Sequence, residues 1–102
     1  MKTAVIVTLF VVQVQSADHV IVQKNKMFDQ KTLKIKVGDS INFKNEEKEI
    51  THNVFSLGPK NSFELKSQAP GKASKVKFDS IGETEVECAI HQNMKLKVIV
   101  EK

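Results

Sequence analysis

The chain has 102 residues, which is enough for one small domain but not for two separate hydrophobic cores. Its single cysteine excludes an intrachain disulfide framework and any four-cysteine zinc or iron–sulfur site. The formal net charge of +4 comes from 16 Lys and no Arg against 12 acidic residues, and the chain contains neither Trp nor Tyr. Because nucleic-acid recognition favours Arg and aromatic stacking platforms, this composition argues against a nucleic-acid partner.

Residues 1–16 show the order of features of a secretory signal peptide. A charged start precedes an apolar run, residues 4–14, that is shorter than the roughly 20 residues needed to span a bilayer. Cleavage between Ser16 and Ala17 would leave a mature domain, residues 17–102, with a net charge of +3. We therefore expect a periplasmic or secreted protein without membrane insertion after signal removal. The alternative is that the β-branched residues of the run form a buried first strand.

After this run, apolar and polar side chains alternate with a period of two, which predicts β-strands separated by turns. The expected strands, in chain order, cover residues 19–23, 32–37, 40–44, 52–56, 74–78, 84–88 and 95–100. The second of these strands stops at the turn pair Gly38-Asp39. Residues 45–49 are expected to form a charged loop, and the stretch around Phe63 fits either a short strand or a helical turn.

This pattern predicts an all-β domain, a Greek-key β-sandwich of about seven to eight strands with two antiparallel sheets packed face to face. No segment has the periodicity of a helix, and we expect a monomer. Met27 and Phe28 fit either the core or an exposed apolar docking patch, and the core is the favoured interpretation.

Four side chains of metal-binding type stand out in the pattern. Cys88, His91 and Met94 lie within seven residues between two expected strands, and His52 precedes Cys88 by 36 residues. A thiolate, two imidazoles and a thioether are the donors of copper electron-transfer sites, in which Cys and two His form a trigonal plane and Met is a weak axial ligand. One tight loop can place three donors around one ion, and His52 would complete the site from a neighbouring strand.

These residues resemble a known family. The stretch Lys36-Val37-Gly38-Asp39, then His52-Asn53-Val54, then Cys-x-x-His-x-x-Met before a final strand, is similar to the cupredoxins, the small blue copper proteins. The ligand-loop spacing is closest to that of amicyanin, and the chain also resembles plastocyanin and pseudoazurin. The resemblance extends over residues 17–102.

The resemblance implies one type 1 copper ion that cycles between Cu(I) and Cu(II), held by His52, Cys88, His91 and Met94. Asn53 follows the first histidine as in the family, where this residue ties the two ligand loops together by hydrogen bonds. The implied function is a one-electron carrier rather than an enzyme, with His91 as the solvent-edge electron port and His52 as the buried ligand. The implied partners are redox proteins, such as a cytochrome c-like protein or a periplasmic dehydrogenase or oxidase.

The residues also fit other interpretations. A copper delivery or storage protein would use the same donors without a shuttle role. Cys88 could be a buried structural thiol, or a zinc ligand in a Cys/His₂ site. A Cys88 nucleophile paired with His91 would make the chain an enzyme, although no third residue is seen to orient the base. A thioether as fourth donor favours copper over zinc.

A second metal site is predicted at the mature amino terminus. After cleavage, the amine of Ala17, the backbone amides of Asp18 and His19, and the His19 imidazole would offer a square-planar set of nitrogens. Cu(II) and Ni(II) prefer this geometry. The alternative is an ordinary histidine at the start of a strand, and cleavage shifted by one residue would remove the site.

Overall fold

The computed structural model describes residues 3–5 and 15–102. Most of the predicted signal peptide, residues 1–16, lies outside the described residues, so its cleavage remains a prediction. The described residues form nine strands and no helix. Accordingly, this part of the chain has no helix long and apolar enough to cross a membrane.

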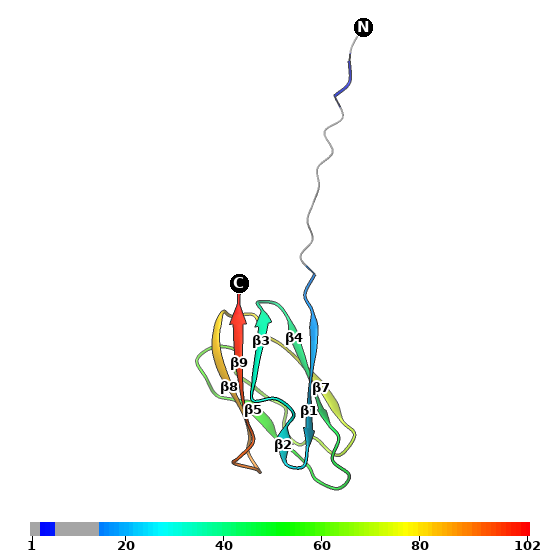
Figure 1. Ribbon diagram of the computed structural model, residues 1–102, viewed down its shortest axis with the longest axis vertical. Helices are drawn as coiled ribbons and strands as arrows, with labels where there is room; N and C mark the ends of the chain where they lie inside the picture. The colour runs from blue at the N-terminus through cyan, green and yellow to red at the C-terminus, as the bar shows by residue number, and fades with distance from the viewer. Residues whose placement is uncertain (1–2, 6–14) are drawn as a thin grey trace.

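The strands form two sheets (Figure 1). The four-stranded sheet contains, in spatial order, β2 (Met27–Phe28), β1 (Asp18–Lys24), β4 (Ser40–Asn45) and β7 (Ala73–Lys77). The five-stranded sheet contains β3 (Thr32–Lys36), β9 (Lys95–Glu101), β8 (Gly82–Cys88), β5 (Val54–Ser56) and β6 (Phe63–Glu64). The all-β sandwich is therefore confirmed, and each of the seven expected strands has a counterpart.

Two features differ from the expectation. The strands β2 and β6 have only two residues each. The stretch around Phe63 is therefore a short strand, β6, rather than a helical turn. The sheets are also mixed rather than antiparallel, because β1 runs parallel to β4 and β3 runs parallel to β9. The β1–β4 pair arises because the chain, after β1 and β2, passes to β3 in the other sheet before it returns to β4, and β3 meets β9 only after the chain has passed through β4 to β8. Such crossovers cannot be deduced from a period of two within one strand.

The core lies between the two sheets and contains the inward-facing apolar residues of both. Its fully buried members are Ile21, Ile41, Phe43, Val54, Phe78, Val86, Leu96 and Val98. Phe28 also belongs to this core, whereas its neighbour Met27 is 54% exposed. Burial thus alternates along the strands as the sequence pattern predicted.

The sandwich has two distinct ends. In Figure 1, β1 begins and β9 finishes at one end, and the loop between β8 and β9 lies at the other end, near β2. The turn at Gly38, with φ of 92°, and Asp39 follow β3 at the end where β9 finishes. We call the end with the β8–β9 loop the loop end and the opposite one the terminal end.

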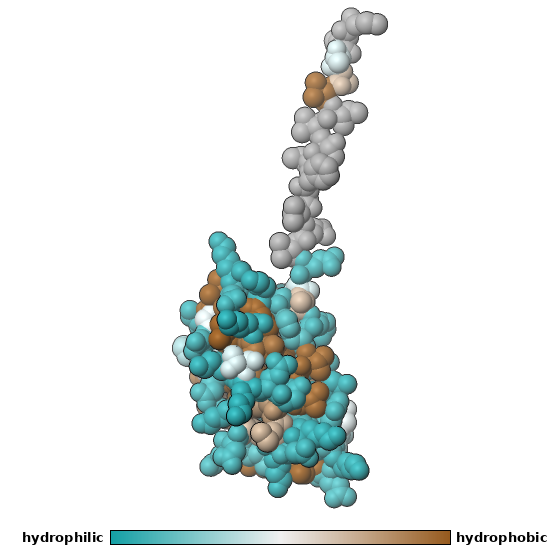
Figure 2. Space-filling model, in the orientation of Figure 1, coloured by the Kyte–Doolittle hydropathy of each residue, from teal (hydrophilic) through white to brown (hydrophobic). Residues whose placement is uncertain are grey.

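The surface of the described domain is mostly hydrophilic. On the face shown in Figure 2, apolar residues appear as separate patches between charged and polar ones. The exposed large apolar side chains of the domain are Val20, Met27, Val37, Leu57, Ile81 and Ile90. Isolated apolar residues of this kind are common on folded proteins.

Candidate metal centre

Three of the predicted ligands come from two segments that meet at the loop end. Cys88 is the last residue of β8 and pairs with Val54, the first residue of β5. His52 lies just before β5, where its backbone N–H donates to Gln68 O at 3.1 Å and its O accepts from Gln68 N at 2.7 Å. His91 lies in the β8–β9 loop. The Met94 N–H donates to His91 O at 3.1 Å and closes this loop into a tight turn.

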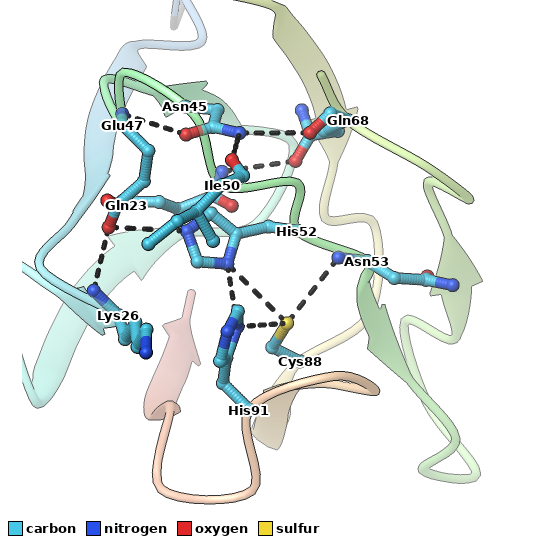
Figure 3. Close-up of polar contacts among 10 residues, drawn as sticks. All are labelled: Gln23, Lys26, Asn45, Glu47, Ile50, His52, Asn53, Gln68, Cys88 and His91. Atoms are coloured by element: carbon cyan, nitrogen blue, oxygen red, sulfur yellow. Dashed lines mark hydrogen bonds and ion pairs between the residues drawn. The ribbon is translucent and has the colours of Figure 1, made fainter. Parts of the chain in front are cut away.

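The donor atoms of His52, Cys88 and His91 converge (Figure 3). Cys88 Sγ lies 3.7 Å from His52 Nδ1 and 3.7 Å from His91 Nδ1, and the two Nδ1 atoms are 3.2 Å apart. The two rings are inclined by 64° with centroids 4.9 Å apart. Among the described residues this is the one cluster of three such donors that could hold a metal ion.

The size of this triangle fits a metal ion. A point equidistant from atoms with these three separations lies about 2 Å from each of them, within the roughly 2.0–2.3 Å of metal–nitrogen and metal–thiolate bonds. Two imidazole nitrogens and a sulfur turned toward one point bring their lone pairs together, which a cation at that point would stabilise. One thiolate and two imidazoles are also the donors of a trigonal copper plane.

The protonation of His52 suits this arrangement. Burial lowers its pKa, because a low-dielectric surrounding disfavours the imidazolium form, and the nearby His91 lowers it further. The contact with Glu47 acts in the opposite direction and is the weaker influence. His52 is fully buried, so its neutral ring has a lone pair available for a metal at neutral pH.

Met94, the predicted axial ligand, is 1% exposed and belongs to the core cluster. It lies at the end of the β8–β9 loop, immediately before β9. His91 is half-buried, and its neighbours Ile90 and Gln92 are exposed. The predicted contrast between a buried His52 and a more accessible His91 is therefore present.

Asn53 links the two ligand segments through its backbone. Its N–H donates to Cys88 Sγ at 3.4 Å, and its O accepts from Ala89 N at 2.9 Å. The Asn53 side chain points away from Cys88 in Figure 3, and Oδ1 has no hydrogen-bond partner among the described residues. The connection expected at Asn53 is present, but the peptide groups make it.

Sequence reasoning missed the side chains that support His52 from the other side. Asn45 and Gln68, which are 1% and 0% exposed, brace the segment that carries it. The Asn45 amide donates to Ile50 O and to Gln68 O, both at 2.9 Å. Glu47 Oε1 lies 3.5 Å from His52 Nε2. The sequence contains no signal that distinguishes Glu47 from the other charged residues of the 45–49 loop.

The predicted amino-terminal site lies at the terminal end, away from this cluster (Figure 1). There the Asp39 carboxylate accepts from Ala17 N at 2.8 Å, and its second oxygen lies 2.9 Å from His19 Nε2. Asp18 pairs with Ser40 in the sheet, and its side chain is 2.8 Å from Lys75 Nζ. Ala17 N and His19 Nε2 are thus both directed at Asp39, and the square-planar site on Ala17, Asp18 and His19 remains a prediction.

Comparison with known proteins identifies the family. The model of the copper binding proteins, plastocyanin/azurin family, matches residues 16–101. Comparison with curated protein sequences gives no match.

Solved structures share the fold. A Cu(I) methionine-to-alanine variant of amicyanin is 22% identical with a TM-score of 0.74, and 81% of each chain is covered. A reduced proline-to-glycine variant of amicyanin at pH 4 is 23% identical with a TM-score of 0.75 and 87% of each chain covered. A copper-containing nitrite reductase from Thermus scotoductus is 23% identical with a TM-score of 0.75. The match covers 96% of this chain but only 25% of the reductase chain.

The family match covers nearly the whole described domain, and the three converging donors supply the chemistry that such a family requires. The cofactor is therefore copper. The chain belongs to the plastocyanin/azurin family of copper-binding proteins, the cupredoxins.

Proposed function

We propose that this protein is a type 1 copper protein that carries single electrons between larger redox proteins and transforms no substrate itself. The observation that supports this most directly is the convergence of one sulfur and two nitrogens, 3.2–3.7 Å apart, at one end of a small sandwich. When bound there, copper supplies a one-electron couple between Cu(I) and Cu(II).

In this proposal His52 Nδ1, Cys88 Sγ and His91 Nδ1 would hold the copper, and Met94 would add a weaker thioether donor that tunes the potential. Backbone hydrogen bonds hold the segments that carry these donors, because His52 is tied to Gln68 and the Met94 N–H closes the turn on His91 O. Donors fixed in this way limit rearrangement between the two oxidation states, which favours fast electron transfer. The Asn53 N–H toward Cys88 Sγ reduces the electron density on the thiolate.

His91 is the proposed electron port. It is the ligand with the greatest exposure of the three, and Ile90, 55% exposed, and Gln92 flank it at the loop end. A redox partner that docks at this end would come closest to the copper. The partner we propose is a cytochrome c-like protein or a periplasmic dehydrogenase or oxidase.

We also propose that the protein is exported and that cleavage between Ser16 and Ala17 yields the working form, residues 17–102. Support comes from the charged start and the short apolar run before the first strand. The mass of the protein recovered from an exporting host tests this proposal. A mass that corresponds to residues 17–102 would support it, and a full-length mass would contradict it.

Electron self-exchange separates a carrier from a copper delivery protein. Mixed Cu(I) and Cu(II) samples of the mature protein should show exchange-broadened NMR lines, since a carrier keeps its copper in both states. A delivery protein would instead release Cu(I) to a moderate chelator and show no reversible couple by voltammetry. That second pattern would contradict the carrier role while leaving copper binding intact.

The position of the port can be tested separately. Gln92→Glu places a charge beside His91, whereas Lys34→Glu changes a strand residue of β3 and acts at long range. At high ionic strength, which shortens the screening length below about 10 Å, Gln92→Glu should slow exchange more than Lys34→Glu. The reverse order would show that the port is not at His91.

A further inference from the structure

A carboxylate lies beside the buried histidine on the side opposite the predicted metal plane. Glu47 belongs to the loop between β4 and β5, and its side chain is only 8% exposed. Its Oε1 accepts from Lys26 N at 2.7 Å and lies 3.5 Å from His52 Nε2 (Figure 3). Buried acidic side chains require compensation, so their positions are informative.

The tautomer of His52 decides whether a proton lies between its Nε2 and Glu47 Oε1. Its Nδ1 faces Cys88 Sγ and His91 Nδ1, so this nitrogen must be deprotonated to act as a metal ligand. The single proton of the neutral ring is then on Nε2. This atom is buried and has no hydrogen bond of good geometry within the described part of the chain. Glu47 Oε1 is the acceptor within ion-pair distance of it.

Both partners are held by the same buried framework. Asn45 Oδ1 accepts from Glu47 N at 2.9 Å, while its amide donates to the backbone of Ile50 and Gln68. Gln68 in turn exchanges two backbone hydrogen bonds with His52. The carboxylate is therefore fixed relative to the ring by several independent bonds rather than by chance loop placement.

We propose that Glu47 is a positioning residue of the copper centre: its carboxylate faces the Nε2–H group of His52, keeps the proton on that nitrogen and the ring in place, and lowers the reduction potential through its negative charge. The inference rests on the proposed ligand role of His52. A buried negative charge stabilises the higher metal charge of Cu(II) more than that of Cu(I), because attraction is weakly screened in the interior. The alternative is a purely structural role, in which Glu47 only accepts the backbone N–H of Lys26 and stabilises that turn.

The reduction potential separates these two roles. Glu47→Gln keeps the length and an acceptor oxygen but removes the charge. Glu46→Gln is the matched control, since it makes the same change in net charge at a side chain that is 45% exposed. The holoprotein of each variant is measured by voltammetry at low and high salt, and the optical spectrum checks copper content.

We expect Glu47→Gln to shift the Cu(I)/Cu(II) ratio at a fixed potential about tenfold toward Cu(I), which is about 59 mV for one electron. The shift should persist at high salt because Glu47 is buried, while any shift in Glu46→Gln should fade. Equal potentials in the two variants at high salt would overturn the proposal. A wild type without a reversible couple would instead overturn the proposed function.

A second measurement needs no variant. In the diamagnetic Cu(I) wild-type protein, the Nε2 proton of His52 should give an NMR signal that exchanges slowly with water, because it is buried and faces the Glu47 carboxylate. In Glu46→Gln the signal should be unchanged, and in Glu47→Gln it should move. A His52 signal from a proton on Nδ1, or rapid exchange of the Nε2 proton, would overturn the proposal even if Glu47→Gln fails to fold.

Discussion

At the loop end His52 Nε2 lies 3.5 Å from Glu47 Oε1, and at the terminal end His19 Nε2 lies 2.9 Å from Asp39 Oδ2. Both pairs join a histidine to a carboxylate that is largely buried. Asp39 accepts two backbone N–H groups besides the His19 ring, from Ala17 at 2.8 Å and Lys36 at 2.9 Å. Glu47 accepts one, from the turn at Lys26.

The difference lies in the second nitrogen of each ring. His52 is fully buried and turns its Nδ1 toward a thiol and another imidazole, whereas the His19 side chain is 28% exposed. Within the described residues, His19 belongs to no group of three converging donors. A histidine–carboxylate pair alone thus stabilises a fold, and it becomes part of a metal site only where other donors meet the ring.

Removing the two histidines separately should produce the largest contrast. His52→Ala should abolish the intense thiolate-to-copper absorption, because the trigonal plane loses one of its three donors. His19→Ala, at the other end, should leave the band unchanged at one equivalent of Cu(II). Optical and EPR spectra of the mature protein provide the measurement. If His52→Ala kept the band, or His19→Ala lost it, the copper site would not be at the loop end.

Replacing the buried methionine should change the potential while keeping the copper. Met94→Leu removes the weak donor that favours Cu(II), so the reduction potential should rise. The fold should survive, since a Met-to-Leu exchange in a core usually costs less than about 1.5 kcal/mol. Met27→Leu is the matched control because Met27 is 54% exposed. Equal potentials in both variants would exclude Met94 as the axial ligand.

A smaller effect, on stability alone, is expected at the terminal end. The hydrogen bond from Ala17 N, followed by that from His19, lowers the pKa of Asp39 from 3.8 to about 2. Asp39→Asn should destabilise the apoprotein by about 1–3 kcal/mol, since buried donors lose a charged acceptor. Urea unfolding measures the change, and Asp79→Asn, at a side chain 69% exposed, is the control with little expected effect.

The same carboxylate predicts a pH dependence. Its pKa is lower in the folded protein than in the unfolded chain, so its extra stabilisation is complete above pH 3.8 and is lost as the pH falls toward about 2. The stability difference between wild type and Asp39→Asn should therefore shrink over this interval. A difference that stays constant down to pH 2 would contradict the role given to Asp39.

Local patterns were enough to predict most strands and the loop that carries Cys88, His91 and Met94. Alternation reports which face of a strand is buried, and the ligand spacing is a property of one short loop. The favoured core position was confirmed for Phe28 but was wrong for Met27, which is 54% exposed because successive residues of a strand face opposite sides. These features depend on neighbours in sequence, which is why the sequence alone could predict them.

The features that escaped prediction depend on contacts between distant segments. Parallel pairing of β1 with β4 follows from the crossover between sheets, which no single strand encodes. Glu47 is one of three acids in a charged loop, and only the fold turns it, unlike Glu46, toward His52. Gln68 likewise braces His52 from 16 residues away in sequence.

The most direct test of the copper site is a Cu(II) titration of residues 17–102 and of the Cys88→Ser variant, followed by optical absorption. We predict one intense blue thiolate-to-copper band that saturates at one copper per chain and is absent from Cys88→Ser. The convergence of Cys88 Sγ with two Nδ1 atoms at 3.7 Å each is its basis. A colourless, zinc-selective wild type, or a band that survives in Cys88→Ser, would contradict it.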